Sequence, residues 1–169
     1  MKSVCLLLCS LLLYCHVHAQ EEKRNEIAVA IGHAHISKGL NENGDRKWLI
    51  AASWSLDYNY NFNKKWSLGL HNDIILDDFD VEREEKVINR KFPVSSCLVG
   101  AFRPVEKLAV MLGAGGEFSS GESFFLGRIG VEYGFELAKS WELSPGITYD
   151  IKFNGYDTWV VSLGIGKKF

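Results

Sequence analysis

Residues 48–60 read WLIAASWSLDYNY, and this stretch decides the fold. Its even positions hold tryptophan, tyrosine and aliphatic side chains, with one alanine among them, whereas its odd positions become small or polar toward the end of the stretch. Apolar side chains that recur at every second residue indicate a β-strand with one face in an apolar environment. The stretch is also long enough to cross a bilayer as a tilted strand, which takes about 9–11 residues.

The same alternation recurs along the rest of the chain. Together with residues 48–60 it predicts eight strands, at residues 26–37, 65–76, 92–103, 107–118, 125–137, 141–153 and 159–169. Short turns are expected at 61–64, 104–106 and 138–140, and longer connections at 38–47, 77–91, 119–122 and 154–157. Alternating short turns and longer loops are typical of outer-membrane barrels, in which both termini lie on the short-turn, periplasmic side. The predicted fold is therefore all-β: an eight-stranded antiparallel up-and-down transmembrane β-barrel.

Alternation alone does not say which face of the strands points outward. In a soluble lipocalin-like barrel the apolar face lines the interior and binds an apolar ligand, whereas in a membrane barrel it faces lipid. The second face of this chain is rich in Gly, Ala and Ser, which suit a narrow interior, and aromatic residues lie near both ends of the expected strands. Aromatic side chains favour membrane–water interfaces, so we favour the membrane barrel and keep the soluble barrel as an alternative.

The first 19 residues have the features of a secretory signal peptide. Lys2 gives a positive start, residues 4–14 are apolar but too short to span a bilayer, and Ala19 ends a small-residue cleavage pattern. We therefore expect residues 1–19 to be removed and residues 20–169 to form one barrel domain that begins at Gln20. Of the four cysteines only Cys97 would remain, so the mature chain has no internal disulfide.

The overall composition excludes other classes of protein. The chain has 169 residues, a length that suggests one domain, with 19 Lys and Arg against 21 Asp and Glu and a formal net charge of −2. A nucleic-acid-binding domain usually shows a basic excess, which is absent from this sequence. No cofactor-binding motif occurs, and no cofactor is expected.

The last strand resembles the assembly signal of bacterial outer-membrane proteins, in which a polar residue and a glycine precede a terminal aromatic residue. Ser162, Gly164 and Phe169 match this signal, whereas Lys167 stands where a hydrophobic residue is usual. Across residues 20–169 the chain resembles the small eight-stranded outer-membrane barrels of the OmpA/OmpX type. Its overall residue pattern is most similar to that of barrel proteins of Bacteroidetes. The resemblance implies a location in the cell outer membrane and insertion by the barrel assembly machinery.

Charged and imidazole side chains on the inward face form the first candidate site. The set comprises His71, Asp73, Arg128 and Glu132, with Glu117, Asp150 and Lys152 nearer the loop end. A histidine beside a carboxylate can act as a general acid/base pair. The alternative, which we favour, is a structural plug, because buried charges need partners and an arginine provides them for carboxylates.

His33 and His35 form a second candidate, because imidazoles two residues apart on one strand can share a metal ion. No third ligand is identifiable from the sequence, although Asp77, Asp78 or Asp80 could reach from the next loop. We therefore favour a pair of histidines in the interfacial girdle. A lipid A-modifying enzyme would need a serine, histidine and acid near the outer leaflet, and we find no matching set. The chain does not meet the requirement for a nucleophile, a base and an oxyanion donor.

The sequence therefore predicts an integral outer-membrane barrel with a filled polar interior, no catalytic activity, and a structural or interaction role through its extracellular loops. The expected partners are outer-membrane lipids and lipopolysaccharide, the barrel assembly machinery, and an unidentified extracellular or envelope protein. An outer-leaflet lipid-modifying enzyme and a soluble periplasmic barrel that binds an apolar ligand remain the alternatives. The charged segment 77–91 is expected to be a solvated loop.

Overall fold

The structure, a computed structural model, describes residues 23–41, 43–83 and 86–169. The predicted signal peptide (residues 1–19) and the predicted mature start at Gln20 lie outside the described residues. No helix among the described residues is long and apolar enough to cross a membrane.

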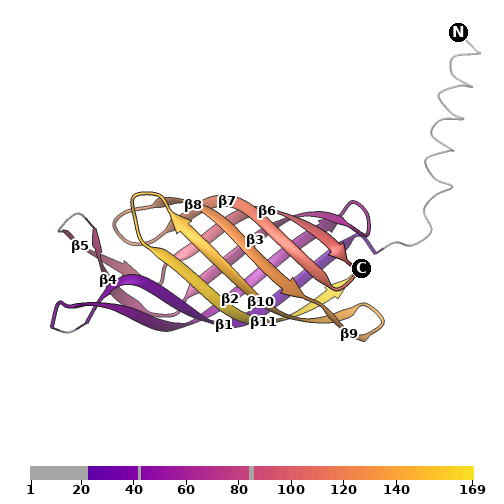
Figure 1. Cartoon of the computed structure of the whole chain (residues 1–169), viewed down its shortest axis with the longest axis horizontal. Coiled ribbons are helices and arrows are strands. Elements are labelled where there is room, and N and C mark those ends of the chain that lie inside the picture. The colour runs from indigo at the N-terminus through magenta and orange to yellow at the C-terminus, as the bar shows by residue number, and fades with distance from the viewer. Residues whose placement is uncertain (1–22, 42, 84–85) are drawn as a thin grey trace, which may run out of the picture.

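Eight antiparallel strand positions close into a barrel (Figure 1). Seven consecutive pairings connect the strands, and β11 pairs with β1 to complete the ring. The short strand β9 (Phe135–Ala138) follows β8 after Gly134 and also pairs with β10. The wall consists of β1 (Asn25–Leu40), β2 (Arg46–Asn61), β3 (Trp66–Ile75), β6 (Val94–Val105), β7 (Leu108–Phe118), β8 (Phe124–Tyr133) with β9, β10 (Trp141–Lys152) and β11 (Asp157–Lys168). The predicted fold class is confirmed.

The seam between the first and the last strand is fully paired. Its register runs from Glu26 opposite Lys168 to Ile36 opposite Thr158. At the end of the chain the Phe169 N–H donates to the Asn25 carbonyl at 2.8 Å, and the Asn25 N–H donates to the Phe169 carbonyl at 3.1 Å. Closure of this kind removes free sheet edges, which is what a strand-built protein requires in lipid.

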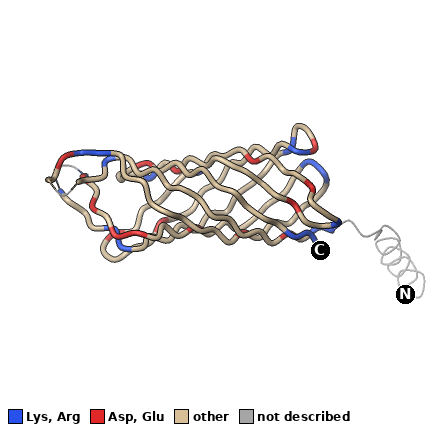
Figure 2. The backbone as a smooth tube through the Cα atoms, turned by 90° about the horizontal axis from the view of Figure 1, so that it is seen from below, with Lys and Arg blue, Asp and Glu red and all other residues tan. Residues whose placement is uncertain are grey.

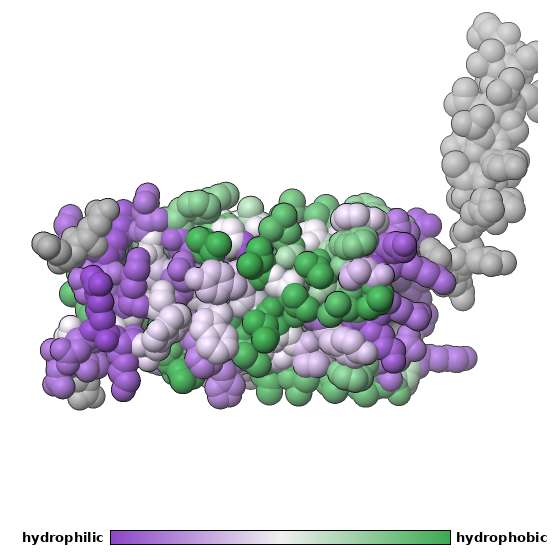
Figure 3. All heavy atoms as spheres, viewed as in Figure 1, coloured by the Kyte–Doolittle hydropathy of each residue, from purple (hydrophilic) through white to green (hydrophobic). Residues whose placement is uncertain are grey.

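The apolar face of the strands points outward. Leu112 is 70% exposed and Trp54 is 60% exposed, whereas the inward-facing Ser53, Cys97 and Arg128 are buried. Hydrophobic side chains gather over the middle of the barrel and hydrophilic ones at both ends (Figure 3). Lysines, arginines and acidic residues likewise gather mainly at the two ends (Figure 2). This arrangement is that of a transmembrane barrel and the reverse of a soluble barrel with an apolar interior.

The segment 77–91 differs from the prediction, because it forms a hairpin rather than a solvated loop. Its strands are β4 (Asp78–Arg83) and β5 (Lys86–Lys91), which pair from Asp78 opposite Lys91 to Arg83 opposite Lys86. The segment forms a hairpin because its side chains alternate: Phe79 and Val81 are buried, whereas the acidic residues that alternate with them, Asp78, Asp80 and Glu82, are not. We call this end of the barrel the hairpin end and the opposite end, where Phe169 lies, the termini end (Figure 1).

Candidate functional site

The middle of the barrel interior is spanned by an ion-pair network centred on Arg128. Arg128 lies on β8 and donates to both carboxylate oxygens of Asp150 on the neighbouring β10, each at 2.7 Å. Its Nη1 donates to Asp73 Oδ2 at 2.6 Å, and Asp73 lies on β3, which is not a neighbour of β8. A guanidinium with its planar set of donors suits such a bidentate pair. The network therefore connects separate walls through the interior.

A second buried cluster lies toward the hairpin end around Glu117 of β7. Its Oε1 accepts hydrogen bonds from Arg90 at 2.5 Å and from the Tyr156 hydroxyl at 2.6 Å. Its Oε2 lies 3.2 Å from Lys152 Nζ, which also donates to Thr158 at 2.7 Å. Arg90 belongs to β5, so the cluster attaches the hairpin to the barrel wall.

The hairpin crosses the mouth of the barrel. It leaves the wall between β3 and β6, yet Val81 of β4 pairs with Gly39 at the far end of β1. Beneath it the rings of Phe79 and Phe124 pack edge-on against Tyr156 at centroid distances of 6.0 and 6.1 Å. These side chains form one buried apolar cluster, which also contains Ala34, Ile36, Ala51, Ile75 and Val81. The mouth at the hairpin end is therefore covered by packed side chains.

Electrostatics at this mouth keep the tyrosine neutral. Burial raises the pKa of Tyr156 above its ordinary value, and the negative charge of Glu117 raises it further. Tyr156 therefore remains a hydroxyl donor to Glu117 at any physiological pH. Arg90 completes the packing, since its guanidinium carbon lies 4.7 Å from the centre of the Phe124 ring and its Nη1 also donates to the Glu122 carbonyl oxygen.

The predicted interior set is divided among several places. Arg128, Asp73 and Asp150 lie together in the middle network, whereas Glu117 and Lys152 belong to the cluster at the hairpin end. The other two members, His71 and Glu132, lie apart from both clusters and toward the termini end.

His71 Nε2 lies 3.0 Å from the Asn59 side-chain oxygen, and its Nδ1 lies 3.9 Å from Asp57 Oδ1. Glu132 lines a small cavity nearer the termini end, together with Glu26 and Asp57.

The sequence reasoning missed Glu26, Asp57, Arg90 and Tyr156. The first two lie on the inward face of their strands, where the alternation itself places them, so this signal was available. Arg90 and Tyr156 lie in segments expected to be connections, and no local pattern marks a side chain that turns back into a barrel mouth.

The other predicted positions lie on the outer face or at the seam. His33 is exposed, and His35 stacks on Trp159 with ring centroids 3.8 Å apart. No group of three or more His, Cys, Asp or Glu in the described part of the chain is arranged to hold a metal ion. Ser162 and Gly164 face the interior on β11, and Lys167 Nζ lies 5.4 Å from the centre of the Trp141 ring.

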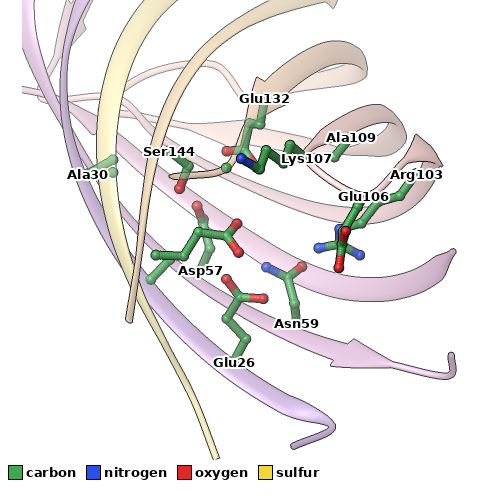
Figure 4. Close-up of a pocket in the computed structure, with 14 residues that line it drawn as sticks. Glu26, Ala30, Asp57, Asn59, Arg103, Glu106, Lys107, Ala109, Glu132 and Ser144 are labelled. Atoms are coloured by element: carbon green, nitrogen blue, oxygen red, sulfur yellow. The ribbon is translucent and has the colours of Figure 1, made fainter. Parts of the chain in front are cut away.

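Two adjoining hollows occupy the termini end. The inner one has a volume of about 30 Å³ and is lined by carboxylate and amide side chains that include Glu26, Asp57 and Asn59 (Figure 4). The outer one is a vestibule of about 600 Å³ that opens at this end. Both are lined by Arg103, Glu106, Lys107, Gly134 and Glu142, so the small cavity is the floor of the vestibule.

The closed ring of eight strands, with lipid-compatible side chains outside and charged ones inside, is the fold of the small outer-membrane β-barrels. Solved structures of this class resemble the chain, which confirms the predicted resemblance to the small eight-stranded outer-membrane barrels. At these levels of sequence identity the likeness concerns the fold. No protein-family model and no curated protein matches the sequence.

Three of these structures illustrate the likeness. Ail, the attachment invasion locus protein of Yersinia pestis, crystallised with the heparin analogue sucrose octasulfate, has a TM-score of 0.54 and 20% identity over 86% of this chain and 99% of its own. The N-terminal β-barrel domain of Pseudomonas aeruginosa OprF has a TM-score of 0.53 and 14% identity over 86% and 98%. Neisserial surface protein A has a TM-score of 0.51 and 12% identity over 86% and 97%.

Proposed function

We propose that this protein is a closed barrel of the bacterial outer membrane that acts as a structural or interaction protein through its extracellular end, and neither as a channel nor as an enzyme. The observation that carries the proposal is the seating of the β4–β5 hairpin across the hairpin end. Gly39 pairs with Val81 there, and the fully buried Arg90 bonds to Glu117 inside the barrel.

Contacts inside the barrel support the proposal of a filled interior. An eight-stranded barrel has room inside for side chains and little more. Arg128 bridges β8, β10 and β3 across the middle, and the cluster around Glu117 occupies the hairpin end. A solute would have to break both sets of charge-assisted bonds to pass, so we expect no general porin activity.

The extracellular end offers an ordered surface for a partner. The β4–β5 hairpin keeps Lys86, Val87 and Asn89 exposed while its inner face is fixed by burial. Ail, a barrel of this fold, has been crystallised with a heparin analogue, which is a precedent for ligand contacts in this class. We assign the unidentified extracellular or envelope partner to this surface, and lipopolysaccharide and other outer-membrane lipids to the apolar belt.

Export and insertion complete the proposal. Residues 1–19 would direct export and be removed, and the barrel assembly machinery would read Ser162, Gly164 and Phe169 on the last strand. The paired carboxyl end supports this reading, because Phe169 closes the seam with Asn25.

Planar-bilayer recording of the purified full chain tests the closed interior, with a variant that lacks residues 78–91 as the comparison. We expect no large stable conductance from the intact chain; such a conductance would overturn the proposal. Labelling of single cysteines placed at Lys86 and at Lys64 on intact cells tests the orientation, and only the first is expected to react. Mass spectrometry of lipid A from cells with and without the protein tests the absence of catalysis, since a changed lipid A would establish an enzyme.

A further inference from the structure

The termini end of the barrel carries two layers of opposite charge. The floor of the vestibule is mainly acidic, because the small cavity is lined by two basic residues, Arg103 and Lys107, and by five acidic ones, Glu26, Asp57, Glu106, Glu132 and Glu142. The mouth is mainly basic, since seven lysines and arginines and only three glutamates line the vestibule. The basic residues of the vestibule lining are Lys23, Arg24, Lys64, Lys65, Arg103, Lys107 and Lys168.

Two carboxylates of the floor have unsatisfied oxygens. Glu26 is 5% exposed and Asp57 is 9% exposed, and Glu26 Oε2 and Asp57 Oδ1 have no hydrogen-bond partner among the described residues. The nearest imidazole nitrogen to that Asp57 oxygen, Nδ1 of His71, lies 3.9 Å away, which is too long for a hydrogen bond. A buried carboxylate oxygen without a donor is costly, so these oxygens are a site for donors that the barrel does not itself provide.

Two cations near this floor are already bonded, one of them to a carboxylate that lines the floor itself. Lys168 Nζ lies 2.5 Å from Glu142, and Arg103 donates to Asn61 and Ser67 at 3.2 and 3.3 Å. Glu26 and Asp57 face a cavity of about 30 Å³, which is the size of one small polar group (Figure 4). A primary ammonium fits such a site, since it is compact and has three donors.

The basic mouth restricts the charge of the ligand that can reach the floor. Lys64, Lys65 and Lys107 line the vestibule and are exposed to solvent. A ligand that only carried positive charge would be repelled by this layer before it reached the floor. A ligand with an anionic group at its other end would be attracted by the mouth and would leave its amine free to enter the floor.

We propose that the vestibule at the termini end binds a small zwitterionic molecule with a primary amine and a carboxylate, such as an amino acid or a short peptide, with its amine between Glu26 and Asp57 and its carboxylate near Lys64 and Lys65. The vestibule of about 600 Å³ has room for a molecule of that size. The site is separate from the extracellular surface of the proposed function, because it opens at the opposite end of the barrel.

Calorimetric titration of the full chain in nanodiscs with glycylglycine tests the proposal. We expect saturable binding that is lost when the amine of the peptide is acetylated. Glu26→Gln and Asp57→Asn should each weaken binding at least tenfold, since each removes a charge-assisted bond. Asp78→Asn, at the hairpin end, should bind as the unsubstituted chain does. A heat-modifiable band on an unboiled gel shows that each variant is a folded barrel.

Two further measurements test the acidic floor and the basic mouth independently. Lys64→Gln combined with Lys65→Gln should weaken the binding of glycylglycine but not that of ethylamine, because the mouth then repels a cation less. Ethylamine or ammonium chloride that binds as tightly as glycylglycine would overturn the zwitterion assignment and leave a simple cation site. Equal binding of the acetylated peptide, or no saturable binding at millimolar glycylglycine, would overturn the proposal altogether.

Discussion

Arg90→Ala is expected to release the β4–β5 hairpin from the barrel mouth without unfolding the barrel. Arg90 is 0% exposed, and its guanidinium joins β5 to Glu117 of β7 and to the carbonyl of Glu122. It also lies over the Phe124 ring at 4.7 Å. Alanine removes all three contacts, whereas the wall pairings of the eight strands do not involve this side chain.

The expected loss of docking free energy follows from the contacts of Arg90. A hydrogen bond to a charged group contributes about 1.5–3 kcal/mol, and a desolvated cation–π contact about 2 kcal/mol. The loss is limited because Glu117 keeps Lys152 and the Tyr156 hydroxyl, and because the Arg90 Nε has no partner among the described residues. We expect a net loss of about 3 kcal/mol in hairpin docking, which raises the undocked population roughly 100-fold.

Limited proteolysis of the protein in nanodiscs with a lysine-specific protease measures this population. Cleavage after Lys86 and Lys91 reports hairpin opening when opening and closing are fast relative to cleavage. Arg46→Ala is the matched control, because Arg46 joins β2 to Glu82 of the same hairpin in an exposed ion pair, and exposed pairs contribute little. Equal cleavage rates in the two variants would refute the assignment of Arg90 as the residue that holds the hairpin.

Three further outcomes are expected. Arg128→Met should lower the free energy of unfolding by about 3–5 kcal/mol in a denaturant titration, because Asp73 and Asp150 are left without their cation; an unchanged midpoint would contradict the interior network. Gly115→Ala should destabilise by about 1–3 kcal/mol, since an added Cβ would overlap the Ser96 carbonyl oxygen, whereas Gly100→Ala, where the nearest atom is 3.8 Å away, should be neutral in the same titration. Deletion of Phe169 should reduce the heat-modifiable band in outer-membrane fractions, and a normal yield would argue against the terminal assembly signal.

The wall of the barrel was predictable because each strand carries its own evidence. Alternation in 48–60 assigns Trp54 to the outer face and Asp57 to the inner face, and both lie there. The observed strand bounds differ from the predicted ones by only a few residues. The expected strand at 125–137 is interrupted at Gly134, after which β9 begins. The period of two is a local property of the backbone, so it needs no knowledge of the partner strand.

Partners across the interior could not be derived in this way. The alternation places Arg128 and Asp73 inward, but which inward residues meet depends on strand tilt and register around the ring, which adjacent residues do not encode. Glu117 illustrates the difference: the pattern places it inside, whereas its main partner, Arg90, comes from a segment that reads as a charged loop.

The two ends of the barrel differ, because the hairpin covers one end and the vestibule opens at the other. The hairpin end is closed by an apolar cluster and a buried ion pair, and the middle is crossed by Arg128. The termini end opens into a vestibule of about 600 Å³ that narrows to a floor of about 30 Å³. A molecule that enters from the termini end therefore meets bound charges before it reaches the hairpin end. Such a geometry suits binding from one side better than passage, because passage would require two buried, low-dielectric ion-pair networks to break together.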